Sequence, residues 1–415
     1  MRRISTDMPN NDMQFRLRRQ ESDLASQRNK LAGQTKILDL RDDPLAASHA
    51  VRYGSYLARL EKFEKNALYA KDHYNVADGY LRQSQDILQR IRELAVQGAN
   101  GTYSRDDMKY MAVEVNELLK EMVQVANAVG PDGKRLFAGD KSFTEPFRLV
   151  EGSIPGGGES MVVRVEYQGA GAERKAEISE NAYSVLDIGG GEAFWAEKMQ
   201  IFSSEDATAY RAGAESAFFI DGIRIPVTAG DTLHGIVAKI NDSAAPVKAF
   251  VDPVTKGLSL EGTNAHLIRL EDEKGSTVLK DLGLLDGASD TGTPNWKSTA
   301  KVSGGSSFDM VIRLRDALLA GDSETVGSRA LAGMDVALSN VGSRLAEIGS
   351  RQERVDFTWK RLNEEIPNVT ANLARESSLD FTSAATDLGM MEFAHKAALQ
   401  TAAKITQPTL LDFLR

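Results

Sequence analysis

Histidine is the side chain that most often supplies metal ligands and proton transfer near neutral pH. No two histidines of this sequence are three or four residues apart, and none lies in an HExxH pattern, so their spacing predicts no metal site. The sequence has no cysteine, which excludes disulfides, thiol nucleophiles and thiolate metal ligands. The five histidines are His49, His73, His234, His266 and His395.

Glycine-rich stretches and paired carboxylates are the other features that could carry chemistry. Glycines cluster at 156–158 and 189–191, but neither cluster precedes Lys-Ser or Lys-Thr or forms GxGxxG, so we interpret both as loops. There is no GxSxG for a hydrolase nucleophile. Asp42 and Asp43 precede Pro44, and this order is typical of a helix start rather than a catalytic dyad. We therefore expect no enzyme and no cofactor.

Composition narrows the class of protein further. The 415 residues are 42% hydrophobic and carry a net charge of −9, which allows a packed core and argues against a general nucleic-acid binder. We interpret the basic cluster Arg16, Arg18 and Arg19 as a solvated helix face. No apolar run reaches about 18 residues, so we expect no membrane insertion. The first ten residues lack an apolar h-region, so a cleaved secretory signal is not expected.

Residues 1 to about 40 have the periodicity of one helix with a mixed seam. Leucines recur every seven residues, and glutamines recur every seven residues between them, at Leu17, Gln20, Leu24, Gln27, Leu31, Gln34 and Leu38. Polar residues in a coiled-coil seam set register and partner rather than add stability. The pattern predicts a segment that orders only with partners.

Two further helices are expected before residue 130. The span from Pro44 to Gln97 has no internal proline and a helical apolar period, which predicts a helix about 80 Å long. Ser104 and Asp107 have the spacing of a capping box, so a second helix is predicted over 105–128. Helices of this length indicate a rod-like bundle.

The composition and the hydrophobic pattern of the sequence change between about 140 and 300. Gly and Pro become frequent and short alternating runs appear, which predicts a β-rich region with one helix near 231–240, capped by Asp231 or Thr232. Helical patterns return over 306–320, 322–374 and 376–406, and we expect Pro367 to kink or divide the second of these.

The predicted fold is mainly α with a β-rich insertion. The N- and C-terminal regions should form a long antiparallel helical hairpin or bundle, with an outer α+β domain at its tip. We divide the chain into five segments. Coiled-coil segments lie at the two ends, at 1–42 and 375–415, and the two halves of a helical rod lie at 43–140 and 305–374. The β-rich domain lies between these halves, at 141–304.

Short motifs along the chain resemble the flagellin-like superfamily. Met1 to Thr6 reads MRRIST, and Asp42 to Ser48 reads DDPLAAS; both are similar to elements of the hook-associated protein 3 family, the hook–filament junction proteins. The run QRIRELAVQGANGT from Gln89 to Thr102 resembles a motif shared with flagellins. The turn GKRLFAG from Gly133 resembles the family's G-x-Y-L-F-G/A-G turn, with Arg135 where an aromatic is usual. The end of the chain, from Lys404 to Leu414, resembles the family's C-terminal tail, from which Pro408 departs.

A second resemblance lies within the β-rich region, at about 218–285. The runs FIDGI from Phe219 and GDTL from Gly230, followed by later short matches as far as Leu284, resemble the hook IN motif of hook-associated proteins.

The resemblance implies a structural subunit of the bacterial flagellum that joins hook to filament and is not an enzyme. It implies hook-associated protein 1, flagellin, neighbouring copies in a ring, the flagellar export apparatus and an export chaperone as partners. The N-terminal seam should then pair with a C-terminal seam that includes Ala384, Ala398 and Ala402. The expected assembly interface comprises Leu17, Gln20, Leu24, Gln27, Leu31, Leu38, Phe381, Leu388, Met391, Ile405, Leu410 and Phe413.

Three alternatives remain open from the sequence. The first is a flagellin or minor filament subunit, which copy number per flagellum would separate from a junction protein. The second is a secreted enzyme with a catalytic domain at 140–300, which would need a clustered constellation beyond His234 and His266. The third is a cytoplasmic coiled-coil scaffold, which localisation would decide.

Overall fold

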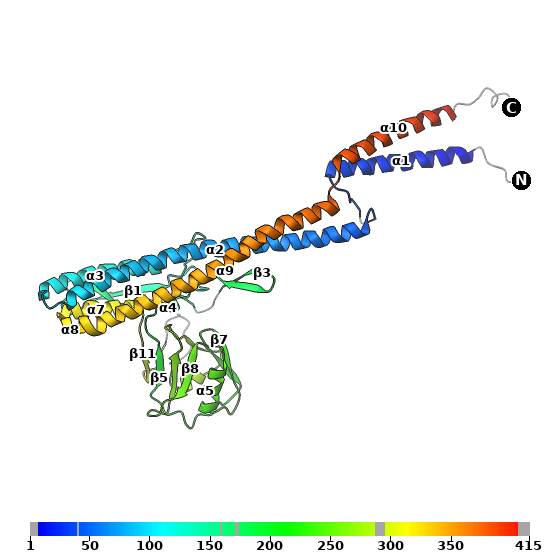
Figure 1. Ribbon diagram of the computed structural model, residues 1–415. Coiled ribbons are helices and arrows are strands. Elements are labelled where there is room, and N and C mark those ends of the chain that lie inside the picture. The colour runs from blue at the N-terminus through cyan, green and yellow to red at the C-terminus, as the bar shows by residue number, and fades with distance from the viewer. Residues whose placement is uncertain (1–6, 40, 158–159, 171–173, 287–294, 406–415) are drawn as a thin grey trace, which may run out of the picture. The chain divides into compact units, whose positions relative to one another are not determined.

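The computed structural model describes residues 7–39, 41–157, 160–170, 174–286 and 295–405. The chain divides into two compact units, and each is treated by itself below. One unit comprises Met1–Lys65 with Trp359–Arg415, and the other comprises Asn66–Thr358. Figure 1 shows the mainly helical chain with its β-rich middle region.

Helices from the two ends of the chain make up the first unit. They are α1, the start of α2, the end of α9 and α10, with bounds Asp7–Gly33, Pro44–Ala99, Leu331–Ser377 and Phe381–Ile405. The start of α2 packs on the end of α9 through a buried cluster of Leu60, Phe63, Leu362 and Val369. This pairing of N- and C-terminal helices confirms the predicted bundle.

The start of α2 follows the expected capping chemistry. Asp43 Oδ1 accepts a hydrogen bond from the Ala46 backbone N–H over 3.0 Å, and Pro44 is the first helical residue. A carboxylate at this end also complements the helix dipole. The Asp42-Asp43 pair therefore serves the backbone, as predicted.

The first helix is shorter than predicted. It ends at Gly33, and Gln34 takes a left-handed conformation with φ 52°, which breaks the helical run. Leu38 lies beyond this break and is 42% exposed, so it does not extend the seam. The prediction of a continuous helix to residue 40 was wrong because periodicity alone does not detect a left-handed residue that is not glycine.

Pro367 lies inside α9 and does not divide it. The proline is exposed, so water can reach the carbonyl that loses its helical hydrogen bond. Leu362 and Val369 on either side are buried against α2. Packing of the flanking residues outweighs the local cost of the proline; of the two expected outcomes, division of the helix was wrong and a kink stays a prediction.

The second unit has its own helical framework. It consists of the rest of α2 and α9 together with α3, α7, α8 and a one-turn π-helix, with bounds Arg105–Ala126, Ser307–Ala320, Ser323–Thr325 and Val326–Ala330. Capping boxes open α3 at Ser104–Asp107 and α7 at Ser306–Asp309. The first of these was predicted from spacing.

The strands of the second unit form small antiparallel sheets. Two hairpins, β1–β2 and β3–β4, have bounds Phe147–Gly152, Met161–Tyr167, Lys175–Ser179 and Ala182–Val185. A four-stranded sheet has the order β11-β5-β9-β8, with bounds Ala300–Ser303, Gln200–Ser203, Leu258–Gly262 and Val247–Val251. A three-stranded sheet has the order β10-β6-β7, with bounds Leu270–Asp272, Ser216–Ile220 and Ile223–Val227. The remaining helices are α4, α5 and α6, at Gly190–Ala193, Leu233–Asp242 and Val278–Asp281.

Thr232 caps α5, because its side chain accepts a hydrogen bond from Gly235 N–H over 3.2 Å. The β-rich middle region was thus predicted correctly, including its one longer helix. An aromatic cluster joins this region to the helices of the second unit. Its rings, 5.0–5.4 Å apart between centroids, belong to Phe137, Phe147, Tyr167, Phe194 and Phe308.

Candidate assembly interface

The helices α1 and α10 pair through a seam with alternating spacings of three and four residues. Ala384 and Ala402 of α10 and Leu24 of α1 are buried, and the other seam residues are partly buried. The partly buried members are Leu17, Gln20, Gln27, Leu31, Leu388, His395 and Ala398. Small residues on α10 allow close approach of the two helices.

Polar contacts fix the register of this pair. Gln27 Nε2 donates to the Ala384 carbonyl over 3.4 Å, and Arg28 Nη2 lies 2.7 Å from Glu392 Oε1. The Arg28 guanidinium lowers the pKa of Glu392 below its ordinary value. The glutamine half of the seam therefore specifies alignment, as expected of polar seam positions.

The same seam contains unpaired polar atoms. Gln20 Oε1 and His395 Nδ1 are buried and have no hydrogen-bond partner among the described residues. Buried polar groups without partners lower stability by about 1–3 kcal/mol each. The α1–α10 pair is thus weaker than a seam of leucines would be.

A second stripe on α10 faces away from α1. At 100° per residue, Met390 and Phe393 fall on the side of the helix roughly opposite Ala384 and Leu388. Met390 is 61% exposed and Phe393 is 76% exposed. Thr386 and Ala397 continue the stripe at spacings of four residues, so it carries no charge from 386 to 397.

Several predicted interface residues do not lie in the α1–α10 seam. Phe381 is 62% exposed at the first turn of α10, and Met391 is 39% exposed at the seam's edge. Ile405 ends α10, and Leu410 and Phe413 lie outside the described residues. Sequence reasoning missed Met390 and Phe393, although their own heptad-like spacing with Thr386 and Ala397 was a usable signal.

The connectors between the helices are hydrogen-bonded to each other. Lys36 N–H donates to the Ser377 carbonyl over 2.8 Å, and Leu379 N–H donates to the Gln34 carbonyl over 3.3 Å. Asp42 accepts the Leu38 N–H over 3.1 Å and pairs with Lys30 at 3.1 Å. These contacts lower the pKa of Asp42. Backbone hydrogen bonds therefore hold the two connectors together where they cross.

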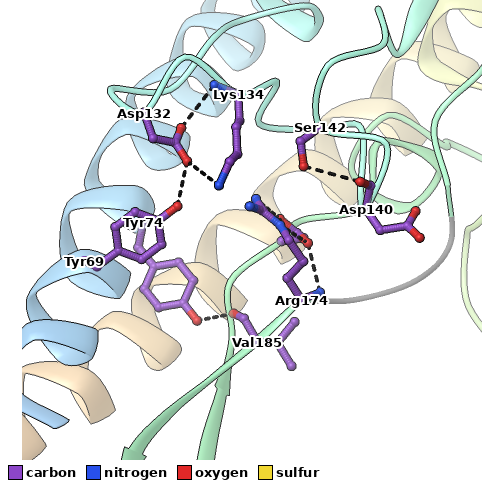
Figure 2. Close-up of polar contacts among 9 residues, drawn as sticks. Tyr69, Tyr74, Asp132, Lys134, Asp140, Ser142, Arg174 and Val185 are labelled. Carbon is purple, nitrogen blue, oxygen red and sulfur yellow. Dashed lines mark hydrogen bonds and ion pairs between the residues drawn. The ribbon is translucent and has the colours of Figure 1, made fainter. Parts of the chain in front are cut away.

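In the second unit, a polar cluster anchors the turn after α3 on helix α2 (Figure 2). Tyr69 Oη donates to Asp132 Oδ2 over 2.6 Å, and Lys134 Nζ lies 3.3 Å from the same carboxylate. Burial raises the pKa of Asp132, but the hydrogen bonds from Tyr69 and Lys134 outweigh it and bring the pKa to about 2. This turn is the GKRLFAG segment of the sequence.

The β3–β4 hairpin is anchored beside it. Arg174 Nε lies 2.9 Å from both oxygens of Asp187, and Tyr74 Oη lies 2.9 Å from Ser184 Oγ. Tyr74 Oη also donates to the Val185 carbonyl (Figure 2). His73 is buried nearby and burial lowers its pKa. Among the described residues, no group of three or more His, Asp or Glu could hold a metal ion. We interpret the cluster as structural.

The described part of the chain contains no helix both long and apolar enough to cross a bilayer.

Comparison with known families matches two stretches of the chain. The family model for the bacterial flagellin N-terminal helical region matches residues 4–142, and the model for the flagellin hook IN motif matches residues 213–264. The chain contains the N-terminal helical region and the hook IN motif of the flagellin family. Its paired terminal helices and β-rich insertion are thus features of a flagellin-like protein, as the motifs predicted.

Curated relatives of this flagellin-like chain include both filament and hook-associated proteins. Flagellin FlaB1 of Treponema pallidum is 34% identical over 125 residues, which are 30% of this chain and 44% of that protein. Flagellar hook-associated protein 3 of Escherichia coli is 28% identical over 152 residues, 37% of this chain and 46% of that protein. In both, the match spans less than half of the relative. Flagellin A of Vibrio anguillarum is 24% identical over 97% of this chain and 96% of its own.

Solved structures similar to this flagellin-like chain include a hook-associated protein and FlgL. Flagellar hook associated protein-3 from Legionella pneumophila has a TM-score of 0.47 at 17% identity, covering 78% of this chain and 97% of that one. FlgL from Xanthomonas campestris has a TM-score of 0.42 at 17% identity, covering 77% and 99%.

Proposed function

We propose that this protein is a structural, non-enzymatic subunit of the bacterial flagellum that occupies the junction between hook and filament. The observation that carries the proposal is the second stripe of α10. Met390 and Phe393 are 61% and 76% exposed on a helix whose other face already packs on α1. Apolar side chains left in water on one stripe of a helix are stabilised when another chain covers them.

The occupant of the stripe is a neighbouring subunit in the same axial assembly. A patch that contacts a different surface on the next copy generates rings or open helical polymers. The interface comprises the α1–α10 pair, including Leu17, Leu24, Leu31 and Leu388, with Phe381 and Met391 at its edges. We also propose the five-segment division of the chain and interface roles for Leu38, Ile405, Leu410 and Phe413.

The proposed partners are hook-associated protein 1 on the hook side, flagellin on the filament side and further copies of this chain. Delivery would use the flagellar export apparatus and an export chaperone. A second candidate is a flagellin or minor filament subunit. The near-complete match to a flagellin of Vibrio anguillarum favours it.

The stripe is tested with the double substitution Met390→Ser and Phe393→Ser in the full chain, expressed in cells that lack the native copy. Both residues are exposed, so the purified monomer should keep its helix content and melting temperature. Incorporation into isolated flagella should fall at least roughly tenfold, because two apolar contacts worth about 1.5–3 kcal/mol each are removed. The matched control is Lys396→Ser, an exposed residue of the same helix outside both stripes. Wild-type incorporation of the double variant would refute the assignment.

Copy number and position separate junction from filament. A junction protein should give a ring's worth of copies per flagellum and immunogold label at the hook–filament joint. A filament subunit should give thousands of copies and label along the filament. Label confined to the cytoplasm would overturn both.

A further inference from the structure

His266 lies in the loop that connects β9 to β10 and is 3% exposed. Its Nδ1 is 3.0 Å from the Asn264 carbonyl oxygen. Its Nε2 is 3.2 Å from Oδ2 of Asp221, in the turn between β6 and β7. Both ring nitrogens therefore face oxygen atoms.

The partners of His266 determine its charge state. A carbonyl oxygen only accepts, and the Asp221 carboxylate already accepts the Arg269 backbone N–H on Oδ1 over 2.8 Å. A neutral imidazole has one N–H and would leave a lone pair facing an oxygen, whereas the imidazolium donates to both. Burial opposes the charged ring, but the contacts with Asp221 and Asn264 outweigh burial and raise the pKa of His266 above its ordinary value.

Other charged groups lie near the ring, and both signs are present. Glu192 of α4 also raises the pKa of His266. His266 lines a cleft of about 490 Å³ together with four basic and four acidic side chains. The basic ones are Lys175, Arg269, Arg344 and Arg351, and the acidic ones are Asp187, Glu192, Asp221 and Glu347. Since Glu192 and Glu347 are already paired with Arg344, the direct contact with Asp221 dominates.

The loop that holds His266 ties the hook IN region to the segment before it. Leu267 N–H donates to the Gly191 carbonyl over 2.9 Å, and Arg269 Nη1 donates to the Gly169 carbonyl. The backbone N–H of Asp221 donates to the Arg269 carbonyl over 2.9 Å. Any loosening between His266 and Asp221 is therefore transmitted to these backbone ties.

We propose that His266 and Asp221 form a pH-dependent latch, closed when the imidazole is protonated and released when it loses its proton. Here, latch means the His266–Asp221 pair with the loop 263–269. A histidine whose folded-state pKa is raised stabilises the fold fully below about pH 6.5, and this stabilisation is lost as the pH rises through the folded-state pKa. The latch thus holds below about pH 6.5 and opens as the pH rises through the folded-state pKa of His266. This inference does not depend on the flagellar position of the chain.

The protonation state is tested on the full chain labelled with ¹⁵N-histidine. Nuclear magnetic resonance should show both ring nitrogens of His266 protonated at pH 6.5, and the signal is assigned by its loss in His266→Gln. Asp221→Asn should lower the titration midpoint by about one pH unit or more. Asparagine tolerates the left-handed backbone of residue 221, where φ is 51°, so this variant should fold. A single protonated nitrogen at pH 6.5, or an unchanged midpoint in Asp221→Asn, would overturn the latch.

The mechanical consequence is tested by hydrogen exchange of peptides spanning 262–270. Rates at pH 5.5 and 8.5 are normalised to the unfolded chain. Wild type should lose protection at Leu267 and Arg269 at least roughly fivefold between the two pH values. His266→Gln should be unprotected at both. His234→Gln, an exposed residue of α5, is the matched control and should follow wild type. Equal protection of His266→Gln and wild type would contradict the proposal.

Discussion

Arg315 of α7 donates a hydrogen bond from Nη1 to Asn116 Oδ1 of α3 over 3.0 Å, although the two residues are 199 apart in the chain. Arg315 is fully buried, and the same Asn116 oxygen accepts the Val162 N–H over 3.2 Å. One amide oxygen thus joins two helices and strand β2. Arg315 also contacts Asp316, whose side chain is 47% exposed.

Asn116→Ala should therefore lower the free energy of unfolding of the second unit by about 2–3 kcal/mol, because it leaves a buried cation and a buried N–H short of a partner. Urea denaturation followed by circular dichroism measures the change. Asn75→Ala, which removes an exposed hydrogen bond to Gln352, is the control and should stay within about 0.5 kcal/mol of wild type. An equal effect of the two substitutions would contradict the role of Asn116.

Asp132 should make stability depend on pH at the acidic end. Its folded-state pKa is lowered from 3.8 to about 2, so its contribution is present above pH 4 and is lost as the pH falls towards 2. The advantage of wild type over Asp132→Asn in free energy of unfolding should shrink by up to about 1 kcal/mol across that window, because solvent screens this exposed residue. Tyr69→Phe should lose part of the same pH-dependent stability. Tyr80→Phe is the control and should lose none of it. A pH-independent difference between wild type and Asp132→Asn would refute the assignment.

Gly190 should not tolerate a side chain. A Cβ there would lie 2.6 Å from the Phe137 carbonyl oxygen and 2.7 Å from the Tyr167 ring. Gly190→Ala should lower the melting temperature, at a cost of about 1–3 kcal/mol. Gly342→Ala is the matched control, because nothing lies within 4 Å of its Cβ position in α9. It should instead raise stability by about 0.5–1 kcal/mol.

Gln20→Leu should tighten the α1–α10 pair. The substitution removes a buried oxygen that has no partner among the described residues and adds an apolar seam residue. Amide hydrogen exchange in α1 should slow roughly tenfold, which corresponds to about 1.4 kcal/mol. Gln14→Leu, on the exposed side of α1, should leave exchange unchanged. Faster exchange in Gln20→Leu would show that glutamine is needed for pairing itself.

Periodicity predicted the long helices and the seam, because burial repeats along α1, α2 and α10 with the helical period. Capping residues predicted the starts of α2 and α3, because a helix cap depends only on residues close together in the sequence. The end of α1 was not predictable, since the left-handed Gln34 accepts a backbone hydrogen bond from Leu379, more than 340 positions away. The latch at His266 and the Arg315–Asn116 contact were equally hidden, because each depends on neighbours brought together by the fold. The spacing of Met390 and Phe393 was visible in the sequence, but the seam of α10 gives a stronger periodic pattern and the stripe was overlooked.

The tied connectors of the first unit have a mechanical consequence. Lys36 and Ser377 share a backbone hydrogen bond at the crossing, and Gln34 and Leu379 share another. A torque applied to either chain end therefore acts on both of these backbone hydrogen bonds at once. Rotation of α1 or α10 about its axis strains the other helix, so the two ends of the chain respond to twisting together.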